Sequence, residues 1–85
     1  MNIEEYRKRI DELDSEIIEK LEERFGIAVK IGELKKESGL PILDAEREWQ
    51  KLESIEAKSN PEYAEYVLDV FEAIILASRT IQEEN

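Results

Sequence analysis

The sequence predicts an all-α fold: three helices, one long N-terminal and two shorter, that form an intertwined homodimer. An apolar period typical of a helix runs from Ile3 to Leu34 without a proline, and two turn-rich segments, 38–41 and 59–61, divide the remainder. The chain has 85 residues and no cysteine. It is therefore expected to be a single domain, residues 1–85, whose marginal core is completed by association rather than by disulfides.

The first helix is expected from about Asn2 to Lys36. Its core-facing positions are Ile3, Tyr6, Ile10, Leu13, Ile17, Ile27, Ile31 and Leu34. Its internal Gly26 and Gly32 each disfavour a helix by roughly 1 kcal/mol, which suggests that they permit a close helix approach. At 1.5 Å per residue this helix is about 50 Å long. Two shorter helices cannot cover such a stripe, so a second copy of the chain is expected to cover the rest.

The segment 38–41 ends the first helix, because Gly39 suits a left-handed C-cap and Pro41 cannot continue a helix. Asp44 is a suitable N-cap for a second helix, expected from about Ala45 to Lys58.

A second turn at 59–61 precedes the third helix, which is expected from about Pro61 to Glu83. Ser59 or Asn60 would be its N-cap and Pro61 its first helical residue. Its apolar face is formed by Tyr63, Val67, Val70, Phe71, Ile74, Ile75 and Ile81.

The charge composition restricts the partners and the chemistry. With 22 acidic and 12 basic residues the net charge is −10, which argues against nucleic acid and anionic membranes as partners. The chain has no histidine and no cysteine, so most zinc sites and cysteine nucleophiles are excluded, and neither a metal nor a cofactor is expected. Without a long apolar run or a signal peptide after Met1, a soluble cytoplasmic protein is expected.

Three cations lie on or beside the surface of the first helix that should be buried. Arg24 replaces an apolar residue in the heptad series that contains Ile17 and Ile31, and Arg7 and Lys35 lie on the neighbouring stripe. Lysine and arginine are almost never fully buried unless they are paired. These residues therefore need an anion, either an internal carboxylate or a bound ligand.

Polar residues on the inner faces of all three helices form a candidate site. Arg24 and Lys35 are three turns apart, about 16 Å along one face, and could clamp a small molecule between them. Glu48 lies on the inner face of the second helix; on the third lie Ser78 and Gln82. Arg7 is about 25 Å from Arg24 along the helix, so it could reach the same ligand only from the partner subunit of an antiparallel dimer.

Each of these residues also has a structural alternative. Arg24 could pair with Glu48 or Asp14, and Lys35 could be a solvated residue near a helix C-terminus. The remaining residues could serve in helix packing, in a charged first turn or on the solvated surface. The convergence of all of them on inner faces favours a functional site.

From Arg7 to Gln82 the chain resembles the all-helical class of chorismate mutases. The motifs that carry the resemblance are, in order, Arg7-x-x-Ile10-x-x-Leu13-Asp14, Glu23-Arg24 with Ala28 and Gly32, Lys35, Pro41, Asp44, Glu46-Arg47-Glu48, Phe71, Ile74-Ile75, Ser78 and Gln82. Each motif is weak alone, but the complete set in this order is specific.

The resemblance implies an intertwined three-helix dimer with two shared active sites, which rearranges chorismate to prephenate. Arg24 and Arg7 of the partner subunit would bind the two substrate carboxylates. Lys35 would contact a carboxylate and the ether oxygen, to which Gln82 would donate a hydrogen bond. Glu48 would accept from the ring hydroxyl, with backbone help near Asp44.

The resemblance also assigns a polar shell to Arg47 and Ser78, and apolar walls to Ile31 and Ile75. Arg79 falls where some relatives carry an apolar wall residue. A pericyclic rearrangement needs no nucleophile, metal or general base, which agrees with the composition. Two alternatives stay open: an isochorismate pyruvate lyase of the same fold, and a non-catalytic helical regulatory or interaction module.

Overall fold

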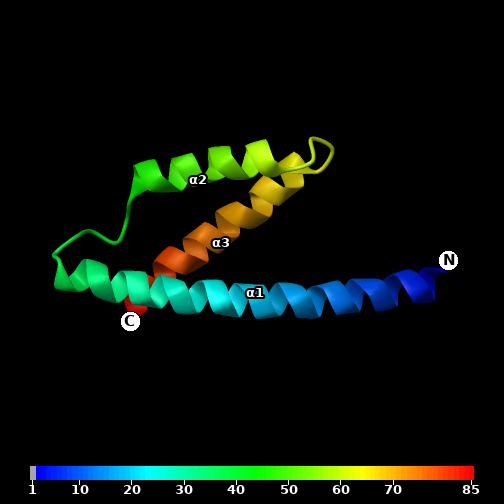
Figure 1. Cartoon of the computed structure of the whole chain (residues 1–85), viewed down its shortest axis with the longest axis horizontal. Coiled ribbons are helices and arrows are strands. Elements are labelled where there is room, and N and C mark those ends of the chain that lie inside the picture. The colour runs from blue at the N-terminus through cyan, green and yellow to red at the C-terminus, as the bar shows by residue number, and fades with distance from the viewer. Residues whose placement is uncertain (1) are drawn as a thin grey trace.

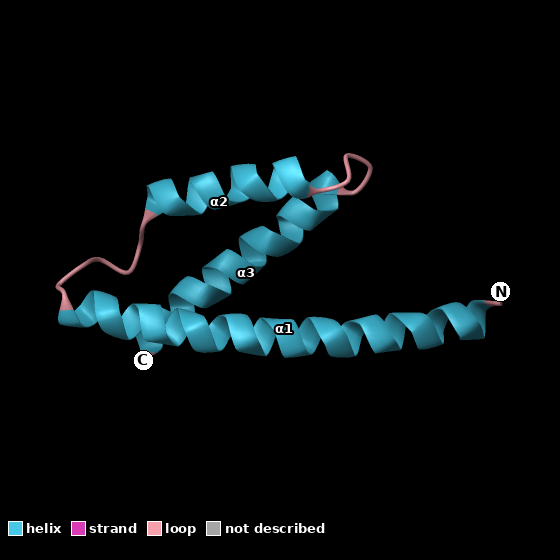
Figure 2. Ribbon diagram, in the orientation of Figure 1, coloured by secondary structure: helices cyan, strands magenta, loops and turns pink. Residues whose placement is uncertain are grey.

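The computed structural model describes residues 2–85, which form three helices joined by two loops (Figure 2). Helix α1 spans Ile3–Glu37, α2 spans Ala45–Lys58 and α3 spans Ala64–Glu84. Figure 1 shows α3 running diagonally between the other two helices, with the C-terminus beside the C-terminal part of α1. Among these residues α3 packs against both α1 and α2, which do not pack directly on each other. The predicted all-α fold of one long and two shorter helices is confirmed.

Local hydrogen bonds define both ends of α1. The Asn2 side chain accepts a hydrogen bond from the backbone N–H of Glu5 at 2.9 Å. At the other end Gly39 has a φ of 68°, and the N–H of Leu40 donates to the carbonyl of Lys35 at 2.8 Å. This is the Schellman arrangement, in which a left-handed glycine lets the chain turn back on the last helical carbonyls. The predicted C-cap at Gly39 is confirmed.

Helix α2 begins and ends as the sequence predicts. Asp44 is its N-cap, because a carboxylate oxygen accepts from the backbone N–H of Arg47 at 3.0 Å. This hydrogen bond satisfies a backbone donor in the first turn of α2 and so fixes where the loop after α1 ends and the helix begins.

The predicted start of α3 at Pro61 is wrong, since the helix begins at Ala64 and residues 61–63 form a turn. Ser59 ends α2 instead of starting α3, and its hydroxyl donates to the carbonyl of Ile55 at 2.6 Å. The side chain of Asn60 accepts from the N–H of Glu62, and its carbonyl accepts from the N–H of Tyr63, both at 2.9 Å. An Asn-initiated turn therefore uses the donors that a helix start would have offered.

The close approach of α1 and α3 depends on Gly32. A Cβ atom at this position would lie 3.0 Å from both Cβ and Cγ of Gln82, and a glycine avoids that overlap. Around Gly26 nothing lies within 4 Å, so the close contact predicted for both glycines holds only for Gly32 within this chain.

The apolar stripe of α1 is largely exposed. Ala28 and Ile55 are the only apolar side chains buried within residues 2–85. Ile3, Ile10 and Ile17 are 54–65% exposed, and the N-terminal end of α1 extends beyond the other helices (Figure 1). An apolar groove of about 590 Å³ between α1 and α3 continues this surface, lined by residues that include Leu13, Ile17, Leu21, Val67, Val70 and Phe71. Coverage of this surface by a second copy stays a prediction.

None of the helices formed by residues 2–85 is both long and apolar enough to cross a membrane.

Candidate active site

A cavity of about 570 Å³ lies between the C-terminal halves of α1 and α3 and the start of α2. Its lining brings together every predicted site residue except Arg7, namely Arg24, Ile31, Lys35, Asp44, Arg47, Glu48, Ile75, Ser78 and Gln82. Helical period had predicted inner faces for Arg24, Lys35, Glu48, Ser78 and Gln82, and the resemblance had added the other four. The roles assigned to all of them stay predictions.

Arg24 is held by α3 rather than by a carboxylate. Its Nη1 donates to the hydroxyl of Ser78 at 2.5 Å, and that hydroxyl donates in turn to the carbonyl of Ile74 at 2.8 Å. Ser78 is 8% exposed. Neither alternative partner, Glu48 or Asp14, forms an ion pair with Arg24 among the residues described. The positive charge of the guanidinium is therefore not paired with a carboxylate of the described residues. Most of its five N–H donors remain for a ligand.

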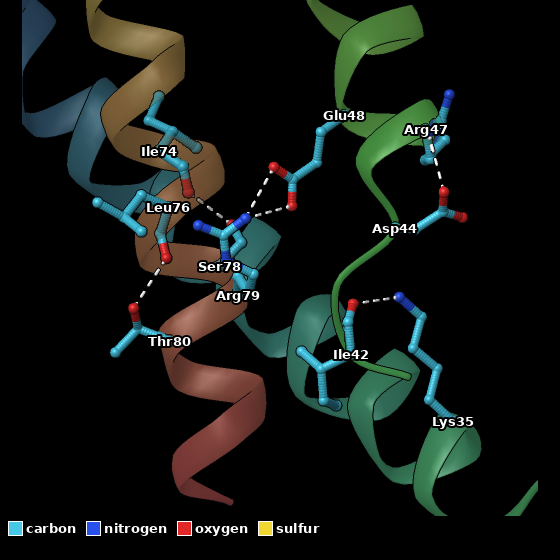
Figure 3. A network of polar contacts seen from close by, with 10 residues as sticks. All are labelled: Lys35, Ile42, Asp44, Arg47, Glu48, Ile74, Leu76, Ser78, Arg79 and Thr80. Carbon is cyan, nitrogen blue, oxygen red and sulfur yellow. Dashed lines mark hydrogen bonds and ion pairs between the residues drawn. The ribbon is translucent and has the colours of Figure 1, made fainter. Parts of the chain in front are cut away.

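Lys35 closes the end of the cavity next to the loop after α1. Its Nζ donates to the carbonyl of Ile42 at 2.8 Å (Figure 3). An ammonium group has three donors, so one hydrogen bond to the loop orients Lys35 and leaves two for a ligand.

Gln82 provides an amide on the part of the cavity lining that α3 forms. The residue is 9% exposed and lies against Gly32, and its side chain forms no hydrogen bond with any other residue that the structure describes. Its amide nitrogen and oxygen are themselves accessible, since no buried side-chain nitrogen or oxygen among residues 2–85 lacks a hydrogen-bond partner. This amide is therefore suited to donate to a molecule bound in the cavity.

Glu48 is paired with Arg79 across the gap between α2 and α3. Nη1 of Arg79 lies 3.0 Å from both carboxylate oxygens of Glu48, and both side chains are 28% exposed (Figure 3). The sequence identified Arg79 as an unusual residue at a wall position but did not predict its pairing with Glu48.

Arg7 lies outside the cavity of its own chain. It is exposed near the start of α1, where its Nη1 contacts Glu4 at 3.0 Å. Its contribution from a partner subunit stays a prediction.

Four further residues line the cavity that the sequence analysis had not placed there: Ile27, Ala28, Ile42 and Lys51. Arg79, at a wall position according to the resemblance, lines it as well. The sequence could have predicted Lys51 at the cavity, because it lies one helical turn after Arg47 and therefore on the same face of the second helix. With these residues the cavity has five cationic side chains and two carboxylates, in a chain whose net charge is −10. Positive charge is thus concentrated at the cavity that all three helices line, which favours a small anion as ligand.

The sequence of residues 6–83 matches the profile of the family described as chorismate mutase type II. The chain belongs to this family. Over 87 aligned residues it is 33% identical to a bifunctional chorismate mutase/prephenate dehydratase of Aquifex aeolicus, covering 96% of this chain and 24% of that protein. It is also 46% identical over 44 residues to a chorismate mutase of Methanocaldococcus jannaschii, covering 52% of this chain and 44% of that protein.

The chain thus spans about a quarter of the first relative's length, and the alignment with the second spans less than half of that protein. No solved structure matches it significantly. The three-helix architecture agrees with membership of the chorismate mutase family, and the resemblance inferred from the motifs is confirmed.

Proposed function

We propose that this chain is a chorismate mutase, an isomerase that converts chorismate to prephenate without a cofactor. The observation that carries the proposal is the cavity, whose lining combines five cationic side chains with the Gln82 amide, which forms no hydrogen bond to the described residues. A dicarboxylate bound there would meet both the charges that hold its carboxylates and a donor for its ether oxygen.

Arg24 is the group best suited to bind a substrate carboxylate. Arginine binds carboxylates through two parallel hydrogen bonds, and the contact with Ser78 pre-orients this guanidinium. Arg47 adds a further positive charge to the lining of the cavity. Ile31 and Ile75 supply apolar surfaces that help to hold the compact, reactive conformer.

Lys35 and Gln82 are proposed to act on the breaking ether bond. Negative charge develops on the ether oxygen as the bond breaks, and donors already aimed at that position stabilise the transition state more than the ground state. Both residues are held by contacts with the protein, Lys35 by the Ile42 carbonyl and Gln82 by its packing on Gly32. Glu48 would accept a hydrogen bond from the ring hydroxyl.

The working form is proposed to be a homodimer with two shared active sites. The exposed stripe of α1 and the adjoining apolar groove support this, because surfaces of this extent are rarely left exposed on a monomer. The partner subunit would cover the stripe and bring its own Arg7 to the second carboxylate of the substrate. Because the substrate is a small soluble metabolite of aromatic amino acid biosynthesis, we expect this reaction in the cytoplasm.

The proposal is tested by incubating the purified chain with chorismate and following the loss of its absorbance, with the product identified by chromatography. Formation of prephenate at a rate abolished in Arg24→Ala is expected. The same protein is offered isochorismate in parallel. Release of pyruvate from isochorismate without prephenate formation would identify a lyase. Absence of both activities, together with no binding of a chorismate-like dicarboxylate, would favour a regulatory or interaction module.

A further inference from the structure

The ion pair between Arg79 and Glu48 differs from every other ion pair among residues 2–85. The other three join residues three positions apart on α1 and are more than half exposed. Arg79 and Glu48 are 31 positions apart, join α3 to α2, and face the cavity with 28% of each side chain exposed. A surface pair contributes little, whereas a half-buried pair with a donor on both carboxylate oxygens constrains both side chains.

We propose that Arg79 is a positioning residue for Glu48 in the reaction proposed above: it fixes the carboxylate as an acceptor for the substrate hydroxyl. The inference rests on the proposed function and adds to it a role for Arg79. An apolar side chain at this position would leave Glu48 without its ion-pair partner.

The geometry leaves Glu48 able to perform this role. An ionised carboxylate has about four lone-pair positions, and Nη1 of Arg79 bridges the two oxygens from one side. The remaining lone pairs are left for a ligand, and Glu48 itself lines the cavity. The pair therefore fixes the direction of the carboxylate without using up its capacity to accept.

The pair also keeps Glu48 away from the substrate-binding cations. An unpaired carboxylate in this cavity would repel a dianion, and it would compete with the substrate for Arg24 or Lys35. Adjacent residues of α3 prevent this. Ser78 holds Arg24 on the side of α1, and Arg79, about 100° further round the helix, holds Glu48 on the side of α2.

A double-mutant cycle tests the inference, because a residue that acts through another loses its effect when that other residue is removed. The variants are Arg79→Met, Glu48→Gln and the double variant, with kcat/KM for chorismate and the melting temperature measured for each. Arg79→Lys tests rescue by a shorter cation. Arg9→Met is the matched control, since it removes the arginine of an exposed pair with Glu12 on α1.

Arg79→Met is expected to lower kcat/KM about tenfold, as for a lost charge-assisted hydrogen bond. In the Glu48→Gln background the same substitution is expected to lower it by less than about twofold. Arg79→Lys should recover most of the loss and Arg9→Met should leave kcat/KM unchanged. If Arg79→Met does not fold, Arg79→Gln takes its place in the cycle.

Two results would overturn the inference while leaving the proposed function intact. Additive losses in the double variant would mean that Arg79 contacts the substrate directly. A lower melting temperature with unchanged kcat/KM would mean that the pair only clamps α2 to α3. A wild-type protein without chorismate mutase activity would overturn the proposed function and this inference together.

Discussion

Replacement of Gly32 by alanine tests whether the approach of α1 to α3 sets the position of Gln82. The added Cβ would lie 3.0 Å from Cβ and Cγ of Gln82 and 3.3 Å from its Cα, whereas ordinary van der Waals contacts are 3.4–4 Å. Because one contact is with the backbone of α3, rotation of the Gln82 side chain alone cannot relieve the overlap. The two helices must separate by roughly 0.5 Å.

The stability and the activity are expected to respond differently to Gly32→Ala. Alanine favours the helix by about 1 kcal/mol, and overpacking opposes it by about 1–3 kcal/mol, so the net loss of stability is small. Misplacement by about 1 Å can reduce a rate about 100-fold, so half that displacement predicts roughly a tenfold loss of kcat/KM. The assay is the initial rate of chorismate loss at several substrate concentrations, below the melting temperature.

Gly26→Ala is the matched control. The same helix receives the same methyl group where nothing lies within 4 Å, so the propensity gain of about 1 kcal/mol should appear as a higher melting temperature with unchanged kcat/KM. A Gly32→Ala variant that behaved like Gly26→Ala would refute the reasoning, because it would show that Gln82 does not depend on this contact.

Further predictions concern the assembly and the ether-oxygen donor. If each site is shared between subunits, the melting temperature rises with protein concentration, and Arg7→Ala and Arg24→Ala are each nearly inactive yet regain activity on mixing. A folded monomer at micromolar concentration, or heterodimers without recovery, would contradict this. Gln82→Glu places an acceptor where a donor is needed, so at neutral pH it should lose about 3 kcal/mol of transition-state stabilisation, at least 100-fold in rate. Its activity should rise as the pH falls and the new carboxyl becomes protonated, while the wild type varies little between about pH 6 and 8 since it has no histidine. A wild-type rate with a flat pH profile in this variant would make Gln82 a packing residue only.

The helices, and the face on which most site residues lie, follow from the sequence because they depend on interactions within a few positions. The hydrogen bonds of the C-cap at Gly39 and the N-cap at Asp44 join residues no more than five positions apart. The helical period is equally local, and it brought Arg24, Lys35 and Gln82 to the same cavity. The start of α3 was predicted wrongly because two local signals compete there. Pro61 favours the first position of a helix, whereas Asn60 favours a turn, and the turn formed.

Only the tertiary structure decided which partners the charged side chains of the cavity have. Arg24 had two candidate carboxylates in the sequence, yet its partner is the hydroxyl of Ser78, 54 positions away. Glu48 could be assigned to an inner face, but its pairing with Arg79, 31 positions away, depends on where α2 crosses α3. Where two helices cross depends on how closely they approach, as α1 and α3 do at Gly32, and helical periodicity contains no information about the distance between two helices.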